Sequence, residues 1–245
     1  MSQTVLLTGA SGGLGQSIAR GLAAKGFSLA LHYHHKREKS FDILTNDLKE
    51  SNATFYTYQS DFRNEKEIVE LISAAQKDLG KIDVVINNAG ISHSAISWKQ
   101  KLVDWQQVMD VNLTAPFLVL REALPLMRKN NFGRIINISS VVAHKPHAGT
   151  SAYAAAKAGL EGLTRAIAME TAKNNITVNA IALGFFDKGM INELDAELQQ
   201  QIIKTIPNEK LGNANELLQC ILYLCNEQSS YITGQTIHLN GGMYF

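Results

Sequence analysis

The chain has 245 residues, 45% of them hydrophobic, and its 23 basic residues nearly balance 22 acidic ones. That length suffices for one α/β domain with a sheet covered on both faces, and a net charge of +1 argues against a nucleic-acid-binding surface. No apolar run approaches the roughly 18 residues that span a membrane, and the N-terminus shows no basic, cleavable leader, so we expect a cytoplasmic protein.

Short apolar runs alternate with longer helix-like stretches, which is typical of repeated βαβ units. The apolar runs predict strands at 4–8, 28–33, 53–58, 82–86, 133–138, 176–181 and 235–239. The intervening stretches predict helices at 14–25, 36–50, 64–79, 101–111, 114–129, 151–173, 193–203 and 213–225. Because no linker interrupts the series, we expect one α/β domain, 1–245, with a Rossmann-type, doubly wound, parallel seven-stranded sheet. The irregular stretch 184–212 predicts a substrate-binding loop.

The first predicted strand runs into a glycine-rich turn and then a helix, the context in which such a turn binds phosphate. Residues 8–15 read TGASGGLG. Gly9 permits the tight turn, Gly13 lets the main chain approach a pyrophosphate, and Gly15 allows close packing of helix on strand. The anion would then lie at the helix N-terminus, where N–H groups lack partners. The alternative is an ordinary glycine-rich turn without a ligand.

Polar residues also close two later strands. Residues 87–90 (NNAG) follow the apolar run 82–86, and Ser140 closes the run 134–140, thirteen positions before Tyr153. Turn chemistry alone would explain either feature. Both, however, share with the glycine turn a place at the carboxyl ends of predicted parallel strands, where open α/β sheets bind their ligands.

Tyr153 and Lys157 lie four residues apart, so they leave one helix face as neighbours. A tyrosine with an ordinary pKa of about 10 is a poor acid–base catalyst at neutral pH. A cation beside it favours the phenolate and lowers that pKa toward the working range. The alternative is a solvated pair on an exposed face. Taken together with the three motifs at the strand ends, however, this pair favours an active site.

Together these motifs resemble the short-chain dehydrogenase/reductase family, and within it the 3-oxoacyl-acyl-carrier-protein reductases. The resemblance runs from 4–9 (TVLLTG) to 231–243 (YITGQTIHLNGGM), and the Tyr–Lys spacing is narrower than in enoyl reductases of the superfamily. It implies NADPH-dependent reduction of a 3-oxoacyl thioester, bound to acyl carrier protein or CoA, in fatty acid or related acyl-chain synthesis. The alternatives are a reductase of another small carbonyl compound or sugar, and a redox-inert nucleotide-binding sensor.

The resemblance also implies catalytic roles. Tyr153 would protonate the substrate carbonyl, and Lys157 would lower the tyrosine pKa and bind the nicotinamide ribose. Ser140 would donate to the same carbonyl. Ser139 competes for that role, but side chains alternate along a strand and the thirteen-residue spacing selects Ser140. Asn112 would hold a water that connects Lys157 to solvent.

Cofactor choice depends on the end of the second strand, where His34 begins the basic run 34–37 (HHKR) with no carboxylate before Glu38. Cations attract a 2′-phosphate that a carboxylate would repel, which favours NADPH; the alternative is a solvated helix start. Gly12 argues against NADPH, because many NADP-dependent relatives carry a basic residue at that position. Asp61 matches the family aspartate that accepts from the adenine amine, unless it caps the next helix. The implied cofactor-binding set is Gly9, Ser11, Gly12, Gly13, Leu14, Gly15, His34, Asp61, Phe62, Asn88, Ala89, Gly90, Tyr153, Lys157, Gly184 and Phe186.

Two departures from the family pattern are visible. Leu183 stands where a proline is usual, which predicts a more mobile loop, and Lys188 stands at a threonine position, either against a cofactor phosphate or in solvent. Asn131 and Asn174 replace arginines thought to meet acyl carrier protein, which weakens the inference that this carrier is a partner. Basic residues lie next to both positions, namely Arg128, Lys129 and Lys173.

Two helices carry more apolar surface than a sheet-covering helix requires, 114–129 and 151–173. Small residues on a second face let another helix approach across a two-fold axis. The resemblance implies a homotetramer, with the last strand forming the other interface. Cys220 and Cys225 fall on different helix faces, and the seven histidines show no metal-ligand spacing, so we expect no metal.

Overall fold

A computed structural model of the chain describes residues 2–34, 39–189, 191 and 195–245. It has one seven-stranded sheet in the order β3-β2-β1-β4-β5-β6-β7, and every strand pair is parallel. The strands are β1 (Thr4–Leu7), β2 (Ser28–Tyr33), β3 (Phe55–Gln59), β4 (Val84–Asn87), β5 (Gly133–Ser140), β6 (Ile176–Leu183) and β7 (Thr236–Leu239). The strand order reverses between β1 and β4, as in a doubly wound sheet. The predicted Rossmann-type fold is confirmed.

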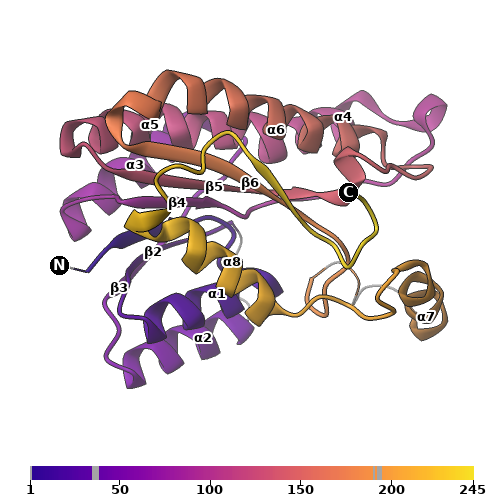
Figure 1. Cartoon of the computed structure of the whole chain (residues 1–245), viewed down its shortest axis with the longest axis horizontal. Coiled ribbons are helices and arrows are strands. Elements are labelled where there is room, and N and C mark those ends of the chain that lie inside the picture. Colours follow the sequence, from indigo (N-terminus) through magenta and orange to yellow (C-terminus); the bar gives the residue numbers. More distant parts are fainter. Residues whose placement is uncertain (1, 35–38, 190, 192–194) are drawn as a thin grey trace.

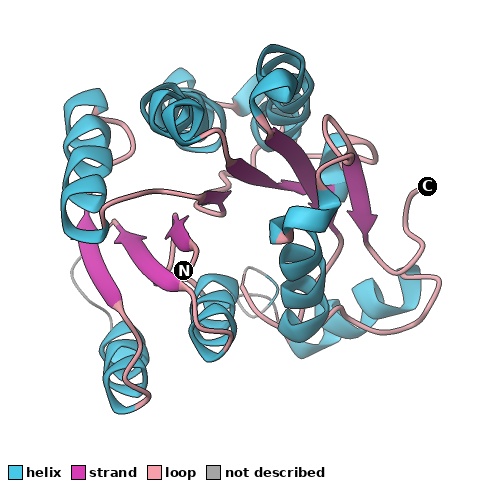
Figure 2. Ribbon diagram, turned by 60° about the vertical axis from the view of Figure 1, so that its left-hand side comes forward, coloured by secondary structure: helices cyan, strands magenta, loops and turns pink. Residues whose placement is uncertain are grey.

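Helices cover both faces of this sheet (Figures 1 and 2). On one face lie α1 (Gly13–Ala24), α2 (Lys39–Glu50) and α8 (Ala214–Cys225). On the other lie α3 (Glu65–Leu79), α5 (Ala115–Asn130) and α6 (Ser151–Thr171), with α4 (Leu102–Met109) beside them. The short α7 (Ala196–Thr205) stands at the periphery. Each face has its own apolar core: Ile18 and Ile221 belong to the first, Ile68 and Leu120 to the second.

The predicted elements are present, with shifted ends and one error. The strands expected at 133–138 and 176–181 run two residues further, to Ser140 and Leu183. The expected break between helices 101–111 and 114–129 is wrong, because a π turn, Asp110–Thr114, joins α4 to α5 without interruption. The first residues of the helices expected at 36–50 and 193–203 lie outside the described residues.

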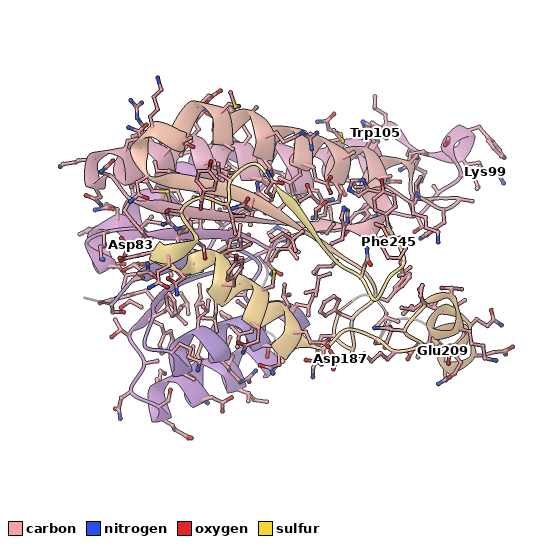
Figure 3. All side chains as sticks on the ribbon, viewed as in Figure 1. Asp83, Lys99, Trp105, Asp187, Glu209 and Phe245 are labelled. Carbon is pink, nitrogen blue, oxygen red and sulfur yellow. The ribbon has the colours of Figure 1, made fainter. Side chains whose placement is uncertain are left out.

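The carboxyl ends of the strands all face one edge of the sheet. Trp105, Asp187 and Phe245 lie toward this edge in Figure 3, whereas Asp83, which precedes β4, lies at the opposite edge. The chain reversals that the motifs occupy are therefore gathered at a single rim. Within the described residues, no helix combines the length and apolarity needed to cross a membrane.

Candidate active site

The glycine turn after β1 is packed tightly against the polar turn after β4. Gly9 has φ +66°, and a Cβ there would lie 2.8 Å from Ala89 Cα. The Asn88 amide donates to the carbonyls of Thr8 (2.9 Å) and Gly9 (3.1 Å). In return, Thr8 Oγ1 accepts from the main-chain N–H groups of Asn88 and Ala89. The NNAG segment therefore holds the shape of the glycine turn, as well as adjoining it.

The N-terminus of α1 is suited to an anion. Gly12 precedes the helix without a side-chain cap, and the first turn carries no acidic residue. Gly12 and Gly13 are exposed, Ser11 and Leu14 are half-buried, and the Ser11 carbonyl is held by Gln16. Unpartnered N–H groups and the helix dipole attract phosphate oxygens at such a point. This end of α1 fits the pyrophosphate of a dinucleotide.

The segment after β6 passes over the same turn. Lys188 is exposed, and its Cβ lies 3.4 Å from the position that a Cβ on Gly13 would take. The Lys188 ammonium can therefore either contact a cofactor phosphate or extend into solvent, which are the two alternatives expected from the sequence. Gly184 packs against Asn240, whose Cα would lie 2.8 Å from an added Cβ. Phe186 is 4% exposed, so any cofactor contact at this residue falls to its main chain.

Leu183 does not loosen the chain at its own position. It is the last residue of β6, it pairs with Ser140 of β5 and Leu239 of β7, and it is 6% exposed. Beyond it, Phe186 and Gly212 form a parallel bridge, and Gly212 exchanges main-chain hydrogen bonds with Phe185 and Asp187. The loop that begins at 184 is therefore closed at its base.

His32 fixes the glycine turn from a position that the sequence did not single out. Its Nδ1 accepts from the Gly9 N–H (3.1 Å), which leaves Nε2–H to donate to the Ser60 carbonyl (3.0 Å). The ring stacks on Phe62, with centroids 3.9 Å apart. Burial lowers the His32 pKa to about 4, so the ring is neutral at physiological pH. The only sequence signal is a polar residue inside the apolar run of β2.

At the end expected to hold adenine, Asp61 is engaged by Arg63. The guanidinium forms a bidentate pair with the carboxylate, with contacts of 2.9 and 2.6 Å. His34 Nε2 lies 3.5 Å from the same carboxylate. The pairing with Arg63 holds the Asp61 pKa well below its usual range. The alternative role of Asp61 as a helix cap is wrong, because Asn64 caps α3 by accepting from the Lys66 N–H. Residues 35–37 of the basic run lie outside the described residues.

The structure brings the three central predicted residues together. Tyr153 and Lys157 lie on α6, with the Lys157 ammonium 5.6 Å from the tyrosine ring centroid. Ser140, the last residue of β5, hydrogen-bonds the Tyr153 hydroxyl and accepts from the Val142 N–H. Ser139 leaves the strand in the other direction and donates to Glu161 (2.6 Å). Ser140 is thus the serine beside the tyrosine.

The charges of this pair differ from the expectation. Burial raises the Tyr153 pKa to about 12, against an opposing hydrogen bond with Ser140. Burial also lowers the Lys157 pKa to about 8, opposed by Glu161. The expected fall of the tyrosine pKa is not found in this structure, because desolvation outweighs the hydrogen bond with Ser140 and the ammonium donates instead to the Ile138 carbonyl (2.7 Å). At neutral pH the phenol is protonated and Lys157 is mostly charged, as a proton donor requires.

Asn112 is fully buried in the π turn and clamps the loop after β4. Its amide donates to the Ile91 carbonyl (2.7 Å) and its oxygen accepts from the Ile91 N–H (3.0 Å). A Cβ on Gly90 would lie 2.8 Å from Asn112 Oδ1 and 3.6 Å from Lys157 Nζ. A larger residue at this position would push the Asn112 amide away from Ile91. A π turn is frequent at functional sites, and its presence here explains an asparagine inside a continuous helix.

Comparisons with known proteins cover the whole arrangement. A family model described as enoyl-(acyl carrier protein) reductase matches residues 9–244. The 3-oxoacyl-acyl-carrier-protein reductase FabG of Staphylococcus aureus (strain Mu50) is 37% identical over 100% of this chain and 99% of that protein. The protein of the same name from Rickettsia bellii (strain RML369-C) is 40% identical, over 98% and 96%. Nodulation protein G of Rhizobium sp. (strain N33) is 38% identical, over 97% and 95%.

These matches agree with the geometry of the rim. The matched residues include 9–15 of the glycine turn, the polar turn after β4, Ser140, and the pair formed by Tyr153 and Lys157. The four-residue spacing of that pair differs from the wider spacing of enoyl reductases, so the name of the family model does not decide the reaction. The chain belongs to the short-chain dehydrogenase/reductase family, and its similarity to the 3-oxoacyl-acyl-carrier-protein reductases indicates an oxidoreductase acting on CH–OH groups.

Proposed function

We propose that the protein reduces a 3-oxoacyl thioester to the 3-hydroxyacyl thioester with NADPH. The observation that carries this proposal is the grouping of Ser140, Tyr153 and Lys157 at the rim of the sheet that also carries the glycine turn. Full-length similarity to proteins named 3-oxoacyl-acyl-carrier-protein reductases supports the substrate class. An inert nucleotide sensor has no need of a serine-bonded tyrosine, which disfavours that alternative.

The chain's own residues account for the proton. When bound, the nicotinamide supplies the hydride to the carbonyl carbon. Tyr153, protonated at neutral pH, donates its proton to the carbonyl oxygen, and Ser140 donates a second hydrogen bond that stabilises the developing charge. The buried Lys157 ammonium offsets the negative charge left on the phenolate. Asn112 holds the loop so that Gly90 lies between its own side chain and that ammonium.

Turnover assays test the reaction and its substrate. The protein should oxidise NADPH with acetoacetyl thioester, and Tyr153→Phe should lower kcat at least about 10²-fold, the usual contribution of a positioned acid. Comparing acetoacetyl-acyl-carrier-protein, acetoacetyl-CoA and a free ketone separates the carriers from the small-carbonyl alternative. Equal rates for Tyr153→Phe and the unaltered protein would end this proposal. Tight NADPH binding without turnover of any ketone would instead favour the sensor.

NADPH specificity is proposed from cations near the expected adenosine end. His34 and Arg63 lie around Asp61, and Lys188 lies beside the glycine turn. A cation at the adenosine end attracts the 2′-phosphate that NADH lacks, whereas Lys188 would meet the pyrophosphate that both cofactors carry. Arg63→Ala should reduce the ratio of kcat/KM for NADPH over NADH at least about fivefold, with Arg20→Ala, whose side chain pairs with Asp47, as the control. A ratio that favours NADH in the unaltered protein would refute the charge argument.

A homotetramer is proposed from the outer helix faces. Phe117 of α5 is 44% exposed and Met169 of α6 is 85% exposed, and Ala155, Ala158 and Ala166 are exposed on α6. Such a face favours burial against a second copy. Sedimentation of the protein at micromolar concentration should give about four times the 26.9 kDa chain mass. A monomer that turns over substrate would refute this assembly.

The carrier proposal depends on that assembly. Asn131 and Asn174 precede β5 and β6, so they lie at the edge of the sheet opposite Tyr153. A carrier that docked there on a single subunit would face the wrong rim. Contact with a neighbouring subunit's active site is the arrangement in which Arg128, Lys129 and Lys173 would serve an acidic carrier. Such a carrier, and a cytoplasmic location, remain parts of the proposed function.

A further inference from the structure

A buried carboxylate lies one helical turn beyond the catalytic lysine, where the proposed mechanism has no use for it. Glu161 is 3% exposed and follows Lys157 by four residues on α6, so the two side chains share one helix face. A buried carboxylate is costly unless it is paired and hydrogen-bonded. The partners of Glu161 therefore indicate what it does.

The first partner is Ser139. Its hydroxyl donates to Glu161 Oε1 at 2.6 Å, a short bond to a charged acceptor, and Ser139 is itself 2% exposed. Ser139 immediately precedes Ser140, and neighbouring residues of a strand point in opposite directions. Fixing the Ser139 side chain under α6 therefore fixes the direction in which Ser140 meets Tyr153.

The second set of partners closes the other side of the carboxylate. His144, just beyond β5, places Nε2 2.8 Å from Glu161 Oε2. The His144 ring stacks on Tyr244, with centroids 4.6 Å apart, and meets His238 of β7 edge to face at 4.9 Å. Among the described residues, the groups that interact with Glu161 are thus Ser139 from β5, Lys157 from α6, His144 from the loop after β5 and His238 from β7. Tyr244, from the C-terminal segment, packs against both histidine rings.

We propose that Glu161 is a positioning residue of the active site, which orients Ser140 through Ser139 and keeps the buried Lys157 ammonium charged. The charge effect follows from Coulomb's law: a buried anion one turn away stabilises the cation that desolvation opposes. Without that anion, Lys157 loses its proton at lower pH and stops offsetting the Tyr153 phenolate. The catalytic consequence of this role rests on the proposed reductase function, but the effect of Glu161 on the charge of Lys157 is measurable without substrate.

The titration of Lys157 tests the electrostatic part in the cofactor-free protein. The 13Cε resonance of Lys157, in protein made with 13C-labelled lysine and assigned with Lys157→Met, reports its protonation against pH. Glu161→Gln keeps the side-chain shape and should lower the titration midpoint of Lys157 by about one pH unit. Glu170→Gln makes the same charge change at an exposed position of the same helix and should leave the midpoint unchanged. If the glutamine variant fails to fold, Glu161→Met removes the charge without leaving an amide to satisfy, and the same shift is expected.

Ser139→Ala tests the positioning part, because it removes the hydrogen bond and keeps the carboxylate. This variant should leave the Lys157 midpoint in place and lower kcat about tenfold, with KM for NADPH changed less than about twofold. An unshifted midpoint in Glu161→Gln, even with lowered stability, would make Glu161 a purely structural residue and overturn the proposal. Full kcat in Ser139→Ala would overturn its positioning part. If the unaltered protein has no reductase activity, the proposed function is refuted. The Lys157 midpoint in Glu161→Gln then still decides whether Glu161 keeps the ammonium charged.

Discussion

Substituting Gly15 by alanine should open the glycine turn and weaken cofactor binding. A Cβ on Gly15 would overlap the Gly9 carbonyl oxygen and would lie 2.9 Å from Ala10 Cα. Both atoms belong to the main chain, so no side chain can rotate to relieve the overlap. Either α1 shifts or the turn widens, and such overpacking typically costs about 1–3 kcal/mol. Because tenfold in affinity corresponds to about 1.4 kcal/mol, we expect the NADPH dissociation constant to rise about 10- to 100-fold.

Gly12→Ala provides the matched control within the same turn. Gly12 has φ −71° and ψ 161°, which any residue adopts, and its added Cβ would meet only the Gly9 carbonyl oxygen at 3.5 Å. NADPH fluorescence titration of both variants, with melting temperatures recorded in parallel, separates loss of binding from loss of fold. If Gly15→Ala binds NADPH as tightly as the unaltered protein does, the overlap with the main chain does not control the shape of the turn.

Three further outcomes are expected. Burial lowers the His32 pKa from 6.5 to about 4, so on acidification the unfolded chain binds a proton at His32 before the folded chain does. The free energy of unfolding should therefore fall as the pH is lowered from about 6.5 to 4. Urea-unfolding midpoints should fall less over this range in His32→Asn. Arg134 is 1% exposed and donates to the carbonyls of Gly133 and Asn175; Arg134→Met should lower the free energy of unfolding by about 2–4 kcal/mol with kcat nearly unchanged, and a loss under about 1 kcal/mol would contradict this. Reduction should keep a constant kcat/KM through neutral pH and decline above about pH 8, where Lys157 loses its proton; a decline already at pH 6 would contradict the assignment.

The parts of the site that the sequence predicted are those fixed by local patterns. The glycine turn, the NNAG segment and Ser140 each follow an apolar run, and a parallel sheet brings such strand ends to one rim whatever the loops between them do. The spacing of Tyr153 and Lys157 is likewise a property of one helix. These features needed no knowledge of which side chains would meet.

The parts that it missed depend on contacts between distant segments. His32 reads as one polar residue in an apolar strand until Gly9 and Ser60 are placed against its two ring nitrogens. Arg63 reads as a solvated cation until its fork closes on Asp61. The Tyr153 pKa was expected to fall, because helical spacing shows a neighbouring cation but not the burial of the phenol, which raises that pKa.

The register between β5 and β6 decides which serine hydroxyl meets Tyr153. Ser139 pairs with Ala182 and Ser140 with Leu183, so the β5–β6 ladder continues to the serine proposed to be catalytic. A proline at 183 would lack the N–H that a ladder uses, whereas leucine retains it. A slip of one residue would exchange the directions of Ser139 and Ser140, and would present the wrong hydroxyl to Tyr153. The extended pairing at Leu183 and the buried bond from Ser139 to Glu161 therefore oppose the same error from two sides.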